Sequence, residues 1–257
     1  FQDRVAVAGG RVRQEPSTHG LEVRGVIDLY FCYRQRFAEV ASWIGYGVGT
    51  RADEYKQNFV YRSGFDDDID ISFVDNDFED PDRECLLDVA ETVNAERVVL
   101  PDIFSVEDVS DVLEFGREVK NIGATPIVVP KCDFDYSRIP RDWIVGYSVP
   151  SGYGSTDVPI GRFTSHDVHL LGGSPSNQFE FAEKAITEGV SIVSADTNSF
   201  GAAASYGNIV NHPKRMADGD GNAWLYDVDE YDDMDGRIIV SLAHYYEAWR
   251  LWCDENL

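Results

Sequence analysis

The feature that most constrains the fold is an alternation of short apolar runs with helix-forming stretches from about residue 68 onward. Each run is four to six residues long and rich in Val and Ile. Such runs are typical of strands buried on both faces of a parallel sheet, and their alternation with helices predicts an α/β fold. The predicted strands are residues 69–74, 97–100, 126–129, 143–148, 168–171 and 190–194.

Capping residues mark the helices between these strands. Ser, Asp and Pro open helices because their side chains or fixed backbone angles suit the first turn, and Gly ends them. The predicted helices are residues 81–95, 106–121, 175–188 and 200–206, with Asp80, Ser105 and Ser174 as N-caps of the first three, Pro81 at the first position, and Gly189 as a stop.

The strand spacing is compact and regular, which favours a closed (β/α)8 TIM-type barrel over an open doubly wound sheet. A length of 257 residues suits one such domain. Residues 1–67 are then expected to supply irregular N-terminal strands, including 25–32 and 59–61. Residues 68–206 are the core β/α units, 207–237 an acidic loop insertion, and 238–257 a C-terminal docking helix.

The last fifty residues contain a possible calcium loop and an apolar helical stripe. Residues 218–222 read Asp-Gly-Asp-Gly-Asn, but Trp224 stands where a calcium loop needs Gly and Glu230 is one place from the bidentate position. A calcium site is therefore not predicted. Over residues 237–253 an apolar stripe recurs at spacings of three and four, which predicts a helix face docked on the domain; it consists of Ile239, Leu242, Tyr246 and Trp249.

The charge balance limits the partners. The chain has 22 Lys plus Arg against 46 Asp plus Glu, a net charge of −24. A surface this acidic excludes a dominant basic patch for nucleic acid. Only five of the basic residues are Lys, and the acids are dispersed along the chain, a pattern that favours a host with molar internal salt, a halophilic archaeon or its virus. The alternative is an ordinary acidic protein.

The cysteines predict reduced thiols in the cytoplasm. Cys32, Cys85, Cys132 and Cys253 are far apart and form no C-x-x-C pair, so neither a zinc site nor a disulfide framework is expected. No apolar run approaches the roughly 18 residues of a membrane span. No phosphate-binding, dinucleotide-binding or metalloprotease motif occurs, so no cofactor, metal or membrane partner is predicted.

Candidate chemistry lies just after the predicted strands, where parallel α/β folds gather their sites. Asp75, Asp102 and Asp196 each follow a strand, and carboxyls in one mouth raise one another's pKa and divide into a proton carrier and an ionised group. Residues 172–174 form a Gly-Gly-Ser turn that could bind an anion or only cap a helix. His169, among apolar neighbours, is interpreted as an interior histidine.

In order along the chain, DNDF, PD, VPK, WIVGYSVPSGYG, VHLLGGSP and VSADTNSFGAA follow or span the predicted strands. This series, over about residues 68–206, resembles the tRNA-guanine transglycosylase superfamily, most closely its phage-type 7-deazaguanine enzymes and an uncharacterised branch in haloarchaea and their viruses. The resemblance implies a barrel that exchanges a base at a glycosidic bond.

The resemblance also implies roles for individual residues. Asp75 would handle protons, Asp196 would be the nucleophile, and Asp102 would recognise the base. Two departures stand out: Asn76 and Asp77 replace the family's Ser-Gly pair, and the zinc site is missing. The remaining residues implied to bind substrate are Phe78, Gly146, Ser148, Gly172, Gly173 and Ser174.

Three functions follow as hypotheses. The first is a transglycosylase-like enzyme that acts on a nucleobase or nucleoside, in DNA or tRNA at high salt, with Asp75 and Asp196 as catalytic residues. The second is a catalytically inactive barrel that serves as a binding or virion-associated module. The third is an unrelated barrel enzyme for a phosphorylated small molecule, bound at residues 172–174.

Overall fold

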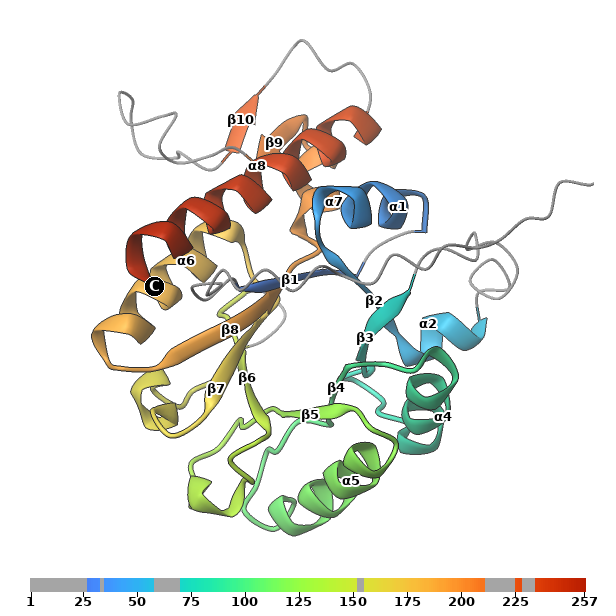
Figure 1. The fold of residues 1–257 in the computed structure, drawn as a ribbon, viewed down its shortest axis with the longest axis vertical. Coiled ribbons are helices and arrows are strands. Elements are labelled where there is room, and N and C mark those ends of the chain that lie inside the picture. The colour runs from blue at the N-terminus through green and yellow to red at the C-terminus, as the bar shows by residue number, and fades with distance from the viewer. Residues whose placement is uncertain (1–26, 33–34, 58–69, 152–154, 211–224, 228–233) are drawn as a thin grey trace, which may run out of the picture.

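The chain folds as a closed barrel of eight parallel strands, which confirms the predicted (β/α)8 TIM-type fold. The computed structural model describes residues 27–32, 35–57, 70–151, 155–210, 225–227 and 234–257. The strands follow one another around the barrel in chain order, β8 pairs with β1, and helices surround them (Figure 1). The strands are β1 (Asp28–Phe31), β2 (Gly47–Arg51), β3 (Ile71–Asp75), β4 (Arg97–Val99), β5 (Thr125–Val128), β6 (Ile144–Ser148), β7 (Asp167–Leu171) and β8 (Ser191–Asp196).

All six predicted strands are present, with ends that differ from the prediction by at most two residues. Of the two N-terminal strands, β1 lies within the expected segment 25–32, whereas β2 was not predicted. Residues 59–61 lie outside the described residues. The sequence of β2, Gly-Val-Gly-Thr-Arg, conceals the strand because Gly is depleted in strands.

The helices pack outside the strands and form the larger core. Short 3₁₀ turns, η1 (Tyr136–Arg138) and η2 (Ile160–Phe163), stand in the connections on either side of β6, where the sequence predicted no helix. The helices are α1 (Gln35–Ile44), α2 (Ala52–Gln57), α4 (Arg83–Val93), α5 (Val109–Asn121), α6 (Pro175–Thr187), α7 (Ser199–Ser205) and α8 (Met234–Asn256). None of these helices combines the length and apolarity needed to cross a bilayer.

Two predicted helix starts are wrong. Helix α4 begins at Arg83, and its N-cap is Asp82, whose carboxylate accepts from Cys85 N at 2.9 Å, so Asp80 and Pro81 lie before the helix. Helix α5 begins at Val109, three residues later than predicted, because Ser105 donates from N and Oγ to Asp108 in a separate turn. The predicted cap of α6 is confirmed.

The barrel interior is filled by side chains. Its apolar part holds Tyr30, Phe73, Val99, Ile127, Val129 and Ile144. Tyr30 stacks on Phe73 with ring centroids 4.7 Å apart, and Phe73 stacks on His169 at 5.2 Å. His169 is thus a polar side chain that packs among the aromatic residues of the interior.

Helix α8 docks on the barrel, but the predicted stripe is only partly correct. Leu242 and Trp249 are buried, and Trp249 stacks on Phe179 of α6 at 4.4 Å, whereas Ile239 is 38% exposed. The buried position is Ile238, one residue before the predicted Ile239. Because an α-helix turns by 100° per residue, a difference of one residue moves a side chain off the buried face.

Part of the predicted loop 207–237 forms secondary structure. Strands β9 (Asn208–Val210) and β10 (Leu225–Asp227) pair antiparallel beside α8, which itself begins at Met234 (Figure 1). The weighed calcium segment, residues 218–222, lies outside the described residues.

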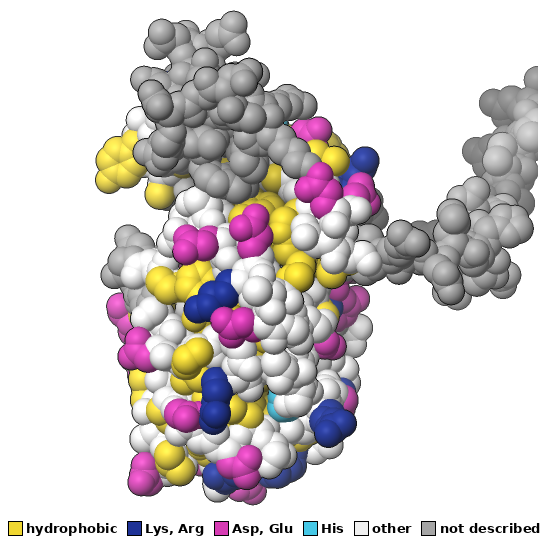
Figure 2. All heavy atoms as spheres, turned by 90° about the vertical axis from the view of Figure 1, so that its left-hand side faces the viewer, with side chains coloured by type: hydrophobic (Ala, Val, Ile, Leu, Met, Phe, Trp, Pro, Cys, Tyr) yellow, Lys and Arg dark blue, Asp and Glu magenta, His cyan; other side chains and the backbone are white. Residues whose placement is uncertain are grey.

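Charge is scattered over the surface that Figure 2 shows. On this face, Asp and Glu side chains lie singly among Lys and Arg, and the described residues form no continuous basic stripe. The acid excess is therefore dispersed here, as the sequence predicted, and phosphate attraction by a basic groove is not a property of this face.

The close approach of β1 and β3 to β2 gives a stability prediction. A Cβ built at Gly49 would lie 2.2 Å from Cys32 Sγ and 2.9 Å from Phe73 Cδ1. We expect Gly49→Ala to lower the free energy of unfolding by about 1–3 kcal/mol through overpacking, as measured by denaturant unfolding.

Cys32→Ala provides the matched test, because it removes the sulfur that a Gly49 Cβ would strike. In a double-mutant cycle, Cys32→Ala should recover part of the stability that Gly49→Ala loses. Strictly additive effects of the two substitutions would contradict this packing.

Candidate functional site

The candidate site is the mouth of the barrel at the carboxyl ends of the strands. Asp75 is the last residue of β3 and Asp196 the last residue of β8. Because strand side chains alternate, Asp75 shares the interior face of Phe73, and Asp196 that of Ser194. The structure thus brings the two predicted catalytic residues into the same mouth, where the charge of Asp196 acts on Asp75.

Asp75 is the proton-carrying carboxyl of this pair. Burial, and after it the charge of Asp196, raises its pKa from 3.8 to about 8, although Asn76 N, which donates to Asp75 Oδ1 at 2.9 Å, and Arg51 oppose the shift. At neutral pH Asp75 therefore holds its proton and can act as a general acid.

Asp196 is held by two donors on one oxygen. Its Oδ1 accepts from Gly172 N and from His169 Nε2, each at 3.1 Å, and the residue is 9% exposed. Its backbone oxygen accepts from Gln178 Nε2 at 2.6 Å, and the same Gln178 nitrogen donates to Gly172 O. These bonds fix the position of the Asp196 carboxyl at the end of β8.

The backbone of the Gly-Gly-Ser turn donates a hydrogen bond to a carboxyl group of the protein itself, that of Asp196. Gly172 and Gly173 have φ of +58° and +79°, a left-handed conformation that directs Gly172 N toward Asp196. Ser174 caps α6 by accepting from Asn177 N at 3.3 Å. Gly172 N is therefore already bonded to Asp196. A phosphate at this turn would be repelled by the neighbouring carboxylate.

A second polar group lies across β4, β5 and β6. Lys131 Nζ donates to Ser148 Oγ at 2.6 Å and lies 3.4 Å from Asp102 Oδ2, and both charged side chains are 12% exposed. Burial raises the pKa of Asp102, and Lys131 opposes that shift. Lys131 was not predicted as a site residue. Its place two residues after the predicted strand 126–129 is the sequence feature that could have indicated it.

Two large aromatic side chains follow strands β3 and β4 in the chain and are exposed. Phe78, after β3, is 49% exposed, and Phe104, after β4, is 65% exposed. Between β4 and Phe104, Ile103 bridges to Pro130 and packs into the outer core. Phe104 was not among the residues predicted from the sequence.

Gly146 lies deeper than the other predicted substrate-binding residues. A Cβ there would lie 2.7 Å from Leu171 Cδ1 and 2.9 Å from Ile127 Cγ2. The structure therefore gives Gly146 a packing role within the barrel, below Ser148 on the same strand.

Asn76 and Asp77, which stand in place of the Ser-Gly pair of the resembling family, both have partners in the structure. Asn76 Nδ2 donates to Val99 O at 3.3 Å and Leu100 O at 3.0 Å, which ties the end of β3 to β4. Asp77 pairs with Arg51 at 3.0 Å, so its charge is compensated. Neither residue leaves an unpaired charge in the mouth.

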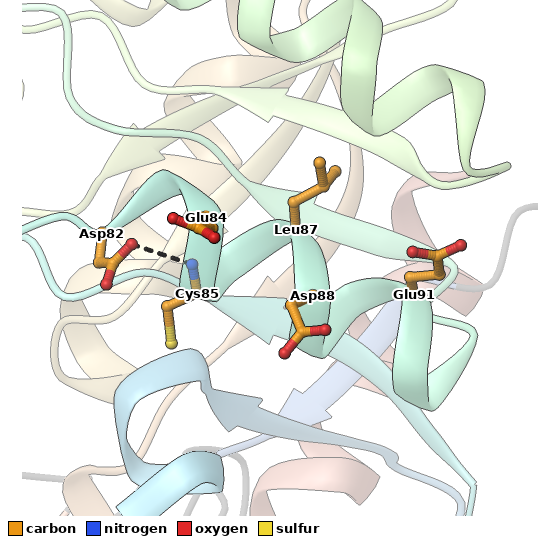
Figure 3. A pocket seen from close by; sticks show the side chains of 6 residues that line it. All are labelled: Asp82, Glu84, Cys85, Leu87, Asp88 and Glu91. Atoms are coloured by element: carbon orange, nitrogen blue, oxygen red, sulfur yellow. Dashed lines mark hydrogen bonds between the residues drawn. The ribbon is translucent and has the colours of Figure 1, made fainter.

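No metal centre emerges from the described residues, among which no group of three or more His, Cys, Asp or Glu side chains has ligand geometry. A pocket on the outer face of α4 gathers carboxylates that project from successive turns of the helix (Figure 3). It lies outside the barrel, and its lining residues are Asp82, Glu84, Cys85, Leu87, Asp88 and Glu91.

A family model described as a family of unknown function, DUF6610, matches residues 41–250. The chain belongs to DUF6610. No curated protein matches this DUF6610 chain. Among solved structures, the YdjI aldolase from Escherichia coli K12 is similar with a TM-score of 0.54 and 8% identity, over 91% of this chain and 92% of that one. At this identity the likeness shows the barrel fold alone.

The raised pKa of Asp75 predicts a pH-dependent stability. A carboxyl whose folded pKa is raised from 3.8 to about 8 stabilises the fold below pH 3.8 and loses that contribution as the pH rises toward 8. We therefore expect Asp75→Asn to gain stability relative to the wild type by about 1.4 kcal/mol per pH unit across this window, as measured by denaturant unfolding at high salt.

Asp80→Asn is the control, since the Asp80 side chain is exposed. If Asp80→Asn changed stability with the same slope, or Asp75→Asn showed no slope, the electrostatic account of Asp75 would be wrong.

Proposed function

We propose that this DUF6610 protein is a transglycosylase-like enzyme that cleaves and re-forms a glycosidic bond between a sugar and a guanine-type base. The observation that carries the proposal is the pair of unlike carboxyls in one mouth, Asp75 with its pKa near 8 and Asp196 held by two hydrogen-bond donors. One protonated and one ionised carboxyl are what displacement at an anomeric carbon requires.

The reaction divides into two balanced steps. Asp196 Oδ2, which neither donor uses, attacks the anomeric carbon while the bond to the base nitrogen breaks. Asp75 gives its proton to the leaving base. The incoming base then loses a proton to Asp75 and attacks the same carbon, which restores the Asp196 carboxylate.

The rim supports recognition of a planar base. Phe78 and Phe104 offer exposed aromatic faces for stacking, and the Asp102 carboxyl beside Lys131 pairs an acceptor with a donor. Ser148, bonded to Lys131, and the backbone of Gly172 and Gly173 complete the proposed binding surface. We include Ser174 only as the cap that holds this turn.

The setting of the reaction is part of the proposal. A dispersed charge of −24 suits a salt-rich archaeal cytoplasm, in an archaeon or its virus, where screening weakens repulsion between the protein and a tRNA or DNA substrate. Affinity must then come from the pocket, because counterion release contributes little at molar salt.

The rival functions are less well supported. A phosphorylated substrate at residues 172–174 would meet the Asp196 carboxylate, which already occupies Gly172 N. An aldol reaction has no support beyond the fold of one structural neighbour. An inactive binding module would bind a ligand at the mouth of the barrel without catalysing exchange. The exchange assay distinguishes it from an enzyme.

The test is exchange of radiolabelled guanine or a 7-deazaguanine into tRNA and DNA at molar salt. We expect Asp196→Asn, which keeps an oxygen acceptor for Gly172 N, and Asp75→Asn each to lower the rate by about 10³-fold or more. Asp80→Asn should retain wild-type exchange, since Asp80 is an exposed residue before α4.

Calorimetry with the free bases distinguishes the proposed enzyme from an inactive binding module. Base binding without exchange by the wild type would contradict the enzyme and support the binding module. The absence of base binding at any salt concentration would overturn the proposal altogether.

A further inference from the structure

A line of three hydrogen-bonded side chains leads from the barrel interior to Asp196. Ser194 Oγ lies 2.7 Å from His169 Nδ1, and His169 Nε2 lies 3.1 Å from Asp196 Oδ1. Ser194 and His169 are both fully buried, so solvent supplies neither with a partner. The line joins β7 and β8, and its outer end is the proposed nucleophile.

An irregularity in strand pairing produces this alignment. Val168 pairs with Ile192, but the next residue, His169, pairs with Ser194, so the register shifts by one residue. Without the shift His169 would face Val193, which has no polar side chain. Bulges of this kind re-aim side chains next to functional sites.

The acceptors along the line decide where its protons lie. An ionised carboxylate only accepts, so His169 Nε2 must carry the hydrogen that it donates to Asp196. Burial lowers the pKa of His169, which keeps the ring neutral, and Nδ1 is then an acceptor. Ser194 Oγ, whose hydroxyl can donate or accept, then donates to Nδ1, so the Asp196 carboxylate selects the Nε2–H tautomer and Ser194 is compatible with it.

Resting on the function proposed above, we propose that His169 and Ser194 are positioning residues that hold Asp196 Oδ1 and leave Oδ2 directed at the anomeric carbon. Gly172 N supplies the second donor to the same oxygen. The carboxylate is thus restrained on one oxygen by two donors, one within β7 and one directly after it, which pre-organises it for attack.

Ser194, His169 and Asp196 are the residue types of a hydrolase triad, but Ser194 is not a nucleophile here. A nucleophilic serine must reach substrate, but Ser194 is 0% exposed and lies on the interior side of His169. The aromatic neighbour Phe73, stacked on His169 at 5.2 Å, fixes the ring plane and fills the space below it. Asp196 is the member of the line that lies at the mouth.

Other groups around Asp196 must be separated from His169 in any pH measurement. The Asp196 charge acts on Asp75 at the end of β3, on Cys32 directly after β1, and on Tyr245 of α8. Tyr245 OH donates to Gln178, which in turn holds the Asp196 backbone. Arg97 and Asp28 act on His169 from β4 and β1.

The first experiment needs no activity. In protein labelled with ¹⁵N-histidine, two-bond ¹H–¹⁵N spectra report the tautomer of each of the five histidines, and His169→Gln assigns the relevant signals. We expect His169 to be neutral with hydrogen on Nε2 at about neutral pH, and Asp196→Ala, which removes the acceptor of that hydrogen, to increase the Nδ1–H form. A protonated ring, an Nδ1–H tautomer in the wild type, or no change in Asp196→Ala would overturn the inference.

The second experiment measures base exchange in variants of the line. Gln can place its Nε2 where imidazole Nε2 lies, whereas Asn is too short. We expect His169→Asn and Ser194→Ala to lower kcat by about 10- to 100-fold with KM little changed, a size typical of lost orienting bonds, and His169→Gln to recover much of the loss. Equal losses in His169→Asn and His169→Gln would indicate a merely structural role and overturn the inference.

The two failures are distinguishable. No exchange by the wild type would remove the proposed function while the tautomer measurement still tested the hydrogen-bonded line. Wild-type exchange with the wrong tautomer would leave the function in place and remove the positioning role. Ser194→Ala, which only deletes one buried oxygen, is the variant that best preserves folding if the His169 variants do not fold.

Discussion

The rest of the structure depends on the need to fill a closed barrel of eight strands. Interior side chains must pack at near-crystalline density, and here Tyr30 and Phe73 fill the space above Gly47 and Gly49, where β2 offers no side chains. Most of this interior is apolar, and Asp75 and Asp196 lie at the strand ends. Asp75 and Asp196 are therefore held by the barrel itself, not by loops, and each must compensate for its burial.

The two carboxyls solve that problem differently. Asp75 keeps its proton, since burial and the neighbouring charge outweigh its single backbone donor and Arg51. Asp196 accepts from Gly172 N and His169 Nε2. The same residue type is thus placed in two different surroundings, and the proposed reaction uses that difference. The chain Tyr245–Gln178 extends the support of Asp196 to α8, so the docked C-terminal helix contributes to the site.

Local patterns predicted strands β3 to β8 because each is a short apolar run between clear turn signals. They failed at β2, where Gly47 and Gly49 are required by side chains from neighbouring strands and carry no strand signal of their own. The cap of α4 moved from Asp80 to Asp82 because both are Asp residues next to Pro81, and only the packed helix selects one. Lys131 was visible at a strand end, but its partners Asp102 and Ser148 come from two other strands.

By itself the sequence determined the βα alternation, the barrel class and the positions of Asp75, Asp102 and Asp196 at strand ends, because strand periodicity and chain order are local properties. The tertiary structure alone decided that Gly172 binds Asp196, that a register shift sets His169 opposite Ser194, and that Asp75 titrates near pH 8. These depend on distances between residues far apart in the chain and on burial, and neither is written in any single segment.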